Sequence, residues 1–550
     1  MHLDEVSQEA RTSNAGALFD ETVEHHGDAL AIETPDRELT HAELRDAAGR
    51  FAGGLSERGF GPGDTLLLYL PNCPEYLISA IGAFRAGVVV SPVNPQYKTR
   101  ELSYQIDDTD ARIVVTHPAL EPIVAETLGG SERDPLVVTV GGDGGDSEGS
   151  TDEESAPTED ETDGAGGGIP FGDVSGEPTI VERADDDVAL LPYTSGTTGQ
   201  PKGVELTHRN FRVQLLSYLA GRDDQVADED VKTLLYLPLY HITGFVHTAM
   251  QPLVRGGALY MRNPAQWSAS KAMGTIEDAG ITHFIGVTAM YVDMVNDENF
   301  DEYDLSSLVS ASEGGAKMSV AVQREFERVA GITMTEGYGL TETSGATHTQ
   351  QGSTFGPQHG SIGQPLRMVD CRIVDDEGKE VPIGEEGELL LRGPQIMSGY
   401  HDMPDATAEA FTENGYFRTG DVARRDDDNY YEIVDRKKHM IVSAGYNVYP
   451  SEVEALLDEH EAVAEAAVVG IDDERRNEIP VAYVVPRPDI EPGTGITADD
   501  LKDFSLQSIA EYKHPREVHF VEELPRTASG KIQKFRLEET HGNGVAEGDD

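Results

Sequence analysis

Residues 193–204 read YTSGTTGQPKGV, and this stretch decides how the rest of the chain is interpreted. Glycines and hydroxyl side chains are interspersed along it, and Lys202 follows them directly. Glycine lets backbone N–H groups turn toward one point, hydroxyls add donors, and lysine adds a mobile positive charge. The apolar run VALLPY at residues 188–193 predicts a strand that delivers this loop from a core. The stretch therefore predicts a loop that binds the oxygens of a polyphosphate, in preference to an exposed Ser/Thr/Gly loop.

The order of residues around the lysine excludes an ordinary P-loop. Pro201 precedes Lys202 and Gly203 follows it, whereas a Walker A loop needs glycine before the lysine and Ser or Thr after it. The predicted phosphate-binding residues are Thr194, Ser195, Gly196, Thr197, Thr198, Gly199 and Lys202.

The chain is strongly acidic. Its 550 residues include 42 Lys and Arg against 100 Asp and Glu, for a net charge of -58. Such a charge repels nucleic acid and anionic membranes, so neither is expected as a partner. The excess resembles the surfaces of proteins from salt-loving organisms, where carboxylates preserve solubility while salt screens their repulsion. We therefore interpret the charge as an adaptation of the organism and not as part of the function.

The sequence contains no expected membrane or export segment. Residues 1–10 (MHLDEVSQEA) lack a basic start and an apolar core, and no apolar run approaches the roughly 20 residues of a membrane helix. We expect a cytoplasmic protein without membrane insertion, and the sequence leaves its oligomeric state open.

Helix and strand patterns alternate through the first part of the chain. A capping box at residues 40–43 (THAE) predicts a helix toward Gly59, and TLLLYL at residues 65–70 predicts a strand. A helix over about residues 75–86 and the strand ARIVVT at residues 111–116 continue the alternation. This pattern predicts an α/β domain with a parallel sheet.

The alternation is interrupted between residues 129 and 176. Residues 141–168 contain ten acidic residues and neither lysine, arginine nor an aromatic residue, so they cannot form a core. We expect residues 129–176 to be a disordered acidic insertion.

The remaining sequence predicts further β/α units and then two changes of pattern. The apolar stretch TLLYLPLYH predicts a strand that ends at His241. From about Asp370, alternating strands and tight turns predict a β-rich subdomain. A second capping box at residues 451–454 (SEVE) opens a helix within a small α+β unit. We expect an N-terminal domain over residues 1–436, a C-terminal domain over residues 437–540, and a disordered tail over residues 541–550.

Six motifs, in this order, carry a resemblance to a known family. The chain resembles the adenylate-forming superfamily of acyl-CoA synthetases, adenylation domains and beetle luciferases, from about residue 15 to residue 540 without the insertion. The motifs are YTSGTTGQPKG, LPLYHITGF, EGYGLTETSG, GYFRTGD, DRKKHMIVSAGYNVYPSEVE and PRTASGKI. The resemblance implies a large N-terminal domain of parallel-type α/β subdomains and a β-rich subdomain, followed by a small mobile α+β lid.

The resemblance also implies a two-step reaction. A carboxylate attacks the α-phosphorus of ATP, pyrophosphate leaves, and the thiol of CoA then displaces AMP. Lys531 matches the residue that serves the first step, Thr341 an α-phosphate contact, and Glu342 the carboxylate that holds Mg²⁺. The loop around Lys202 then supports the departing pyrophosphate, and His241 matches a position near the carboxylate of the acid.

The other matched positions concern the nucleotide and CoA. Tyr338 matches the aromatic residue that stacks on adenine, and Asp421 and Arg436 match the ribose contacts. Lys438 matches the hinge between the two domains, and Gly445 matches a position past which the pantetheine chain runs. The segment that matches the other face of adenine is Gly315, Ala316 and Lys317.

Several functions fit these motifs unequally. A ligase that joins a medium- or long-chain fatty acid to CoA is favoured, and its rival is a stand-alone enzyme that loads a carrier-protein thiol. A fused assembly line is disfavoured because no carrier segment follows residue 540, and a luciferase-type oxygenase lacks support. A catalytically silent nucleotide-binding protein is disfavoured by the joint presence of Lys202, Glu342, Asp421 and Lys531, and an NTPase motor by the missing Walker A pattern.

Overall fold

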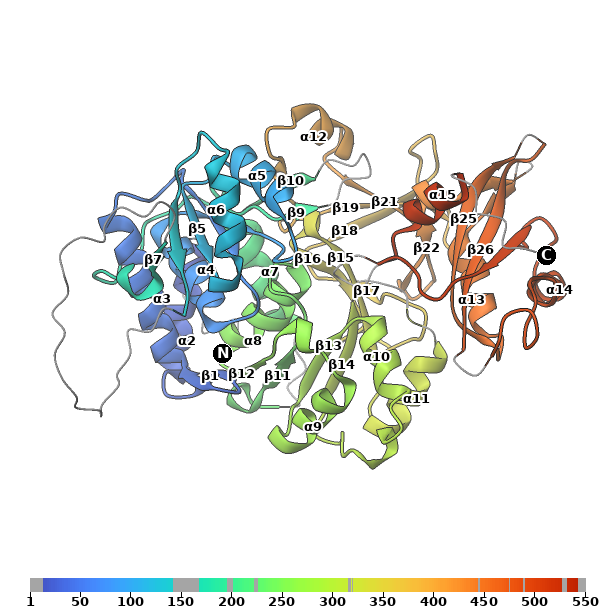
Figure 1. The fold of residues 1–550 in the computed structure, drawn as a ribbon, viewed down its shortest axis with the longest axis horizontal. Coiled ribbons are helices and arrows are strands. Elements are labelled where there is room, and N and C mark those ends of the chain that lie inside the picture. Colours follow the sequence, from blue (N-terminus) through green and yellow to red (C-terminus); the bar gives the residue numbers. More distant parts are fainter. Residues whose placement is uncertain are drawn as a thin grey trace.

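The computed structural model describes most of the chain (Figure 1). The described residues are 13–141, 168–194, 201–221, 226–314, 318, 320–443, 446–473, 475–487, 490–526 and 532–542. Among them, no helix combines the length and the apolar character that a membrane span requires.

The first sheet follows the strand order β20-β10-β8-β4-β3-β5-β6-β7, with β9 paired to β10. Helices cover both faces of β3, because Leu66 and Leu68 join the cluster of α3 and α4 whereas Leu67 and Tyr69 join that of α5 and α6. A strand covered on both faces requires a continuous apolar sequence, which explains TLLLYL. The strands are β3 (Thr65–Tyr69), β4 (Val89–Pro92), β5 (Ile113–Thr116), β6 (Leu136–Thr139), β7 (Ile169–Pro170), β8 (Val188–Leu190), β9 (Tyr193–Thr194), β10 (Lys202–Thr207) and β20 (Gly399–Tyr400).

The second sheet follows the order β17-β16-β15-β14-β13-β11-β12-β1-β2. Strands β11, β13, β14 and β15 are parallel neighbours, so their carboxyl ends meet at one edge. Ligands of α/β proteins bind at such an edge. The strands are β1 (Leu30–Thr34), β2 (Arg37–Thr40), β11 (Lys232–Leu235), β12 (Ala258–Met261), β13 (His283–Gly286), β14 (Ser310–Gly314), β15 (Thr335–Leu340), β16 (Gly345–Thr349) and β17 (Gln364–Pro365).

Two smaller sheets complete the fold. The predicted β-rich subdomain is the antiparallel sheet β18 (Asp370–Val374), β19 (Gly387–Arg392), β21 (Phe417–Arg425) and β22 (Tyr431–Arg436). The C-terminal unit, orange to red at the right of Figure 1, contains β23 (Ile441–Ser443), β24 (Tyr446–Val448), β25 (Val463–Asp473), β26 (Asn477–Pro486) and β27 (Glu517–Phe520). One apolar cluster packs α13 and α14 on this sheet, and a second cluster packs α15 on it.

Helices surround these sheets. The α-helices are α2 (Leu18–His26), α3 (His41–Glu57), α4 (Pro74–Ala86), α5 (Thr99–Asp108), α6 (Glu121–Gly129), α7 (His208–Gly221), α8 (Gln251–Arg255), α9 (Ala269–Ala279), α10 (Thr288–Val295), α11 (Val320–Ala330), α12 (Pro404–Ala410), α13 (Pro450–Asp458), α14 (Ala498–Ser508) and α15 (Lys534–Gly542). The short helices are η2 (Ala15–Ala17), η3 (Pro118–Leu120), η4 (Phe171–Asp173), η5 (Asp228–Asp230), η6 (Thr243–Met250), η7 (Pro264–Gln266), η8 (Phe300–Glu302), η9 (Thr341–Thr343) and η10 (Lys437–His439).

The α/β architecture and the first capping box are confirmed. Thr40 is the N-cap of α3, and its side chain and that of Glu43 bond reciprocally to each other's backbone. The second predicted capping box is wrong. Helix α13 begins at Pro450 without a side-chain cap, because the Ser451 hydroxyl donates to the carbonyl of Val434 (2.5 Å) instead.

Three predicted boundaries also need correction. The strand expected to end at His241 ends at Leu235, because a turn follows it. The range 129–176 was too wide for an insertion: β6 and β7 lie within it, because the apolar run LVVT extends the parallel sheet beside β5. Residues 142–167 lie outside the described part of the chain. At the other end, α15 reaches Gly542, two residues into the expected tail.

A hydrogen bond to the buried side chain of His247 connects η6, a π-helix, to the second sheet. The backbone N–H of Ala346 on β16 donates to Nε2 of His247 (2.8 Å). Burial lowers the pKa of His247 to about 4. The unfolded chain, with an ordinary histidine pKa near 6.5, therefore takes up this proton before the folded chain does, so stability is lost as the pH falls from about 6.5 toward 4.

We predict that His247→Gln reduces the acid sensitivity of the fold. Glutamine offers an oxygen to Ala346 but does not titrate, so the loss of unfolding free energy between pH 7 and pH 5 shrinks by about 2 kcal/mol. Denaturant titrations at both pH values in constant high salt measure the difference. His117→Gln is the control, because Nδ1 of His117 also accepts a backbone N–H, from Ala119 (3.2 Å). An unchanged pH dependence in His247→Gln would contradict the assignment.

Candidate active site

The predicted phosphate loop leaves the first sheet through a short hairpin. Strands β9 and β10 pair antiparallel, with Thr194 opposite Lys202. The hairpin fixes both ends of the loop and places Lys202 at the start of β10. Residues 195–200, which include the predicted Ser195, Gly196, Thr197, Thr198 and Gly199, lie outside the described residues.

Two tyrosines tie the base of this hairpin to α5. The Tyr193 hydroxyl donates to Oδ2 of Asp108 (2.5 Å), and the Tyr104 hydroxyl donates to the carbonyl of Pro201 (3.0 Å). Their rings meet edge to face, with centroids 6.3 Å apart. The loop therefore begins and ends on a rigid support.

Tyr400 brings the lysine of the hairpin and the predicted metal ligand together. Its hydroxyl donates to Oε1 of Glu342 (3.0 Å), and Nζ of Lys202 lies 4.8 Å from the centre of its ring. Burial, and then the Glu342 carboxylate, raise the pKa of Tyr400 above its ordinary value, so the hydroxyl stays protonated and donates. Sequence reasoning missed Tyr400, since a single tyrosine after Gly399 gave no pattern to distinguish it.

A tight turn presents Thr341 and Glu342 at the carboxyl end of β15. The N–H of Leu340 donates to Oγ1 of Thr343 (2.8 Å), and Ser344 takes the left-handed conformation with φ 57°. Gly345 has φ 118°, and a Cβ there would overlap the ring of His247. This turn therefore depends on a glycine and on the buried histidine beneath it.

A buried carboxylate joins β15 to the β-rich subdomain. Asp421 on β21 is 2% exposed. The Tyr338 hydroxyl donates to its Oδ2 (2.5 Å), and Nε of Arg436 lies 2.6 Å from its Oδ1. Burial, and then Asp421, raise the pKa of Tyr338 well above its ordinary value. The structure thus brings together three predicted residues that are up to 98 positions apart in sequence.

The segment after Arg436 carries two lysines with different surroundings. Lys437 is paired with Asp376 (2.9 Å) and Glu388 (3.5 Å), which fixes it to the β-rich subdomain. Lys438 is exposed, and partial desolvation followed by repulsion from Arg436 lowers its pKa. Gly445 and Lys531 lie outside the described residues.

His241 and the end of β14 border the same edge of the second sheet. The ring of His241 packs against that of Tyr240, with centroids 4.5 Å apart. A Cβ added to Gly314 would lie 3.8 Å from the methyl group of Thr243, so the end of β14 faces the start of η6 closely. Gly315, Ala316 and Lys317, which follow β14, lie outside the described residues.

The described site residues form two groups with distinct chemistry. Lys202, Tyr400 and Glu342 combine a cation, a hydrogen-bond donor and a carboxylate, which suits a polyphosphate and its divalent cation. Tyr338, Asp421 and Arg436 combine an aromatic ring with a buried carboxylate, which suits a base and a pair of vicinal hydroxyls.

Two family models match the chain. The model described as AMP-binding enzyme matches residues 19–401, and the model described as AMP-binding enzyme C-terminal domain matches residues 452–531.

Similar proteins cover nearly the whole chain. The long-chain-fatty-acid–CoA ligase of Bacillus subtilis (strain 168) is 32% identical over 94% of this chain and 93% of its own. The feruloyl-CoA synthase of an Amycolatopsis species is 33% identical over 94% of this chain and 96% of its own. The solved structure of the anthranilate CoA ligase AuaEII in complex with anthranoyl-AMP superimposes with a TM-score of 0.84, at 26% identity over 98% of this chain and 99% of that one.

We predict that Tyr400→Phe weakens the binding of ATP in the presence of Mg²⁺ by about tenfold. The change removes the donor to Glu342 but keeps the ring beside Lys202, and a hydrogen bond to a charged group contributes about 1.5–3 kcal/mol. Calorimetric titration measures the dissociation constant. Tyr416→Phe is the matched control, because the Tyr416 hydroxyl also donates to a carboxylate, that of Asp370 (2.5 Å), within the β-rich subdomain. Equal effects of the two changes would refute the role of Tyr400.

Proposed function

The chain belongs to the AMP-binding enzyme family, and from this premise we propose that it joins a carboxylic acid to CoA through an acyl-adenylate. The acid and ATP form acyl-AMP and pyrophosphate, and CoA then gives acyl-CoA and AMP. The observation that carries the proposal is the meeting of Lys202 and Glu342 at Tyr400, because this reaction needs a cation and a carboxylate beside one polyphosphate.

The adenosine part of ATP is assigned to the second group of residues. Tyr338 stacks on the adenine, and Gly315, Ala316 and Lys317 line its other face. The two oxygens of Asp421 accept from the two ribose hydroxyls, while Arg436 orients that carboxylate and supplies a second ribose contact. The resemblance of the EGYGLTE and YFRTGD motifs supports these roles.

The phosphates are assigned to the hairpin loop and the turn after β15. Thr194, Ser195, Gly196, Thr197, Thr198, Gly199 and Lys202 surround the β- and γ-phosphates and stabilise the departing pyrophosphate. Thr341 donates to the α-phosphate. Glu342 would hold Mg²⁺, which prefers one or two carboxylates with phosphate oxygens and water. The ion would neutralise charge on the phosphates when bound.

The reacting atoms are assigned to residues of both domains. Lys531 contacts the carboxylate oxygen and the α-phosphate as negative charge builds between them, because its long side chain carries a compact charge. His241 borders the carboxylate of the acid. For the second step the C-terminal domain rotates about Lys438, which withdraws Lys531 and brings the strand around Gly445 to the thiol.

A medium- or long-chain fatty acid is the proposed substrate. The ligase of Bacillus subtilis, which is named for long-chain fatty acids, supports this choice, while the feruloyl and anthranilate relatives make aromatic acids the competing class. Transfer to a carrier-protein thiol is the alternative second step. The proposed location of the enzyme is a salt-rich cytoplasm, in keeping with its net charge of -58.

The products of ATP cleavage test the proposed reaction. Purified protein in high salt, given Mg-ATP, CoA and a panel of acids, is expected to release AMP and pyrophosphate in equal amounts and to form thioester with aliphatic acids at the highest kcat/KM. Formation of ADP and phosphate would rule out adenylation. A preference for aromatic acids would overturn the substrate class alone.

We predict that Lys531→Ala separates the two half-reactions. The variant loses acyl-adenylate formation by about 100-fold or more, because charge developing at the reaction centre loses its stabilising cation. It still converts supplied acyl-adenylate and CoA to thioester. Lys502→Ala is the control, because Lys502 pairs with Asp499 (3.2 Å) on the surface of the same domain. Equal loss of both half-reactions would contradict the use of Lys531 in one step only.

A further inference from the structure

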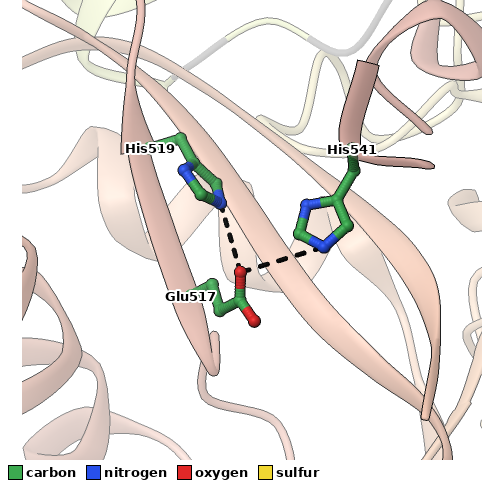
Figure 2. Close-up of side chains that lie close together, drawn as sticks. All are labelled: Glu517, His519 and His541. Atoms are coloured by element: carbon green, nitrogen blue, oxygen red, sulfur yellow. Dashed lines mark hydrogen bonds and ion pairs between the residues drawn. The ribbon is translucent and has the colours of Figure 1, made fainter. Parts of the chain in front are cut away.

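Three potential metal ligands converge in the C-terminal unit, outside the site described above. Glu517 and His519 lie on β27 and His541 lies in the last turn of α15, and the side chains of all three point toward one another (Figure 2). We propose that these residues bind one divalent transition-metal ion of the zinc class, which links α15 to β27.

The strand and the helix place the ligands on one face of the sheet. Residues 517 and 519 alternate with Val518, which faces the apolar cluster under α13 and α14, so Glu517 and His519 point to the opposite face. Helix α15 covers that face through Leu537, and His541 follows Leu537 by one helical turn. The convergence is therefore a consequence of the packing of α15.

His519 is held in place by its neighbours. Its ring stacks on that of Tyr483, with centroids 5.3 Å apart and an interplanar angle of 29°. The Tyr483 hydroxyl donates to the carbonyl of Leu537 (3.2 Å), which ties the same tyrosine to α15. Tyr483 thus fixes one ligand and the helix that carries another, and preorganised ligands bind ions more tightly.

The distances suit an ion of this size. Oε2 of Glu517 lies 3.3 Å from Nε2 of His519 and 3.9 Å from Nε2 of His541, and the three ligand atoms lie within 4.8 Å of one another. Zinc–ligand bonds of about 2.0–2.2 Å at tetrahedral angles separate ligand atoms by roughly 3.3 Å. The Glu517–His519 distance already meets this value, and the Glu517–His541 distance exceeds it by about 0.6 Å.

The donor set selects the class of ion. Two imidazoles and one carboxylate favour Zn²⁺, Co²⁺, Ni²⁺ or Cu²⁺, whereas Mg²⁺ and Ca²⁺ prefer oxygen ligands. The side chains of His519 and His541 are 27% and 21% exposed, so the ion can enter from solvent and keep water as a fourth ligand. This site is thereby distinct from the Mg²⁺ position proposed at Glu342.

The proposed metal site lies on the helix that follows the segment carrying Lys531. Helix α15 begins at Lys534, three residues after Lys531. An ion that links its last turn to β27 anchors the far end of the segment carrying Lys531. An ion that binds the folded domain but not the unfolded chain also raises the free energy of unfolding of the domain by mass action.

Metal titration of the full-length protein tests the proposal. Metal-stripped protein in high potassium chloride, without nucleotide, is titrated with Zn²⁺ by calorimetry and with Co²⁺ by absorption spectroscopy. High salt screens weak binding to the acidic surface. We expect one strong site per chain, a Co²⁺ spectrum of low coordination number, and a higher unfolding temperature with Zn²⁺.

Variants locate the bound ion. We expect each of the substitutions Glu517→Gln, His519→Gln and His541→Gln to weaken Zn²⁺ binding by at least about 100-fold. Removing a residue that only hydrogen-bonds to a metal ligand typically costs about 10–100-fold in affinity, and removing the ligand itself costs more. His359→Gln is the matched control and is expected to bind as the unchanged protein does, because His359 pairs with Glu327 (3.0 Å) without belonging to this cluster. Circular dichroism checks that each variant folds.

Two results would overturn the proposal. One is the absence of a strong site in the unchanged protein. The other is a site that survives all three substitutions, which would place the ion elsewhere on the chain.

Discussion

The buried carboxylate of Asp421 is the group on which the arrangement of the site depends. It receives the hydroxyl of Tyr338 from the second sheet and the guanidinium of Arg436 from the last residue of β22. A buried charge is tolerated only where such partners compensate its desolvation, and removal of one partner leaves the other unpaired. Asp421 therefore fixes the positions of the Tyr338 ring, the β-rich subdomain and the start of the interdomain segment relative to one another.

Contacts between distant segments also place the phosphate-binding residues. Lys202, Glu342 and Tyr400 come from three separate segments and meet because β20 pairs with β10, which brings Tyr400 opposite Val204 and beside the lysine of the hairpin. Tyr400 then joins a cation and an anion that do not contact each other directly. Opposite charges held apart by a neutral donor remain available to a phosphate chain and its cation.

The sequence proposes residues for the site but does not predict the contacts that hold them. The hairpin loop was predicted from its own glycines, hydroxyls and lysine, because these residue types report local chemistry, whereas the turn after β15 and Asp421 were assigned through the resemblance of short motifs to a known family. Tyr400 was missed, because its role arises from pairing between strands that are almost 200 residues apart. The capping box predicted at Ser451 failed for a related reason: the Ser451 hydroxyl bonds to Val434, a tertiary contact that a local pattern does not contain.

The fate of the carboxylate oxygens tests the central claim most directly. If the acid attacks the α-phosphorus of ATP, an acid labelled with ¹⁸O in both carboxylate positions gives AMP that carries one labelled oxygen per thioester formed. Mass spectrometry of the AMP measures this transfer. One label in AMP is the result that acyl-adenylate formation predicts, and unlabelled AMP, or label in inorganic phosphate formed with ADP, would contradict it.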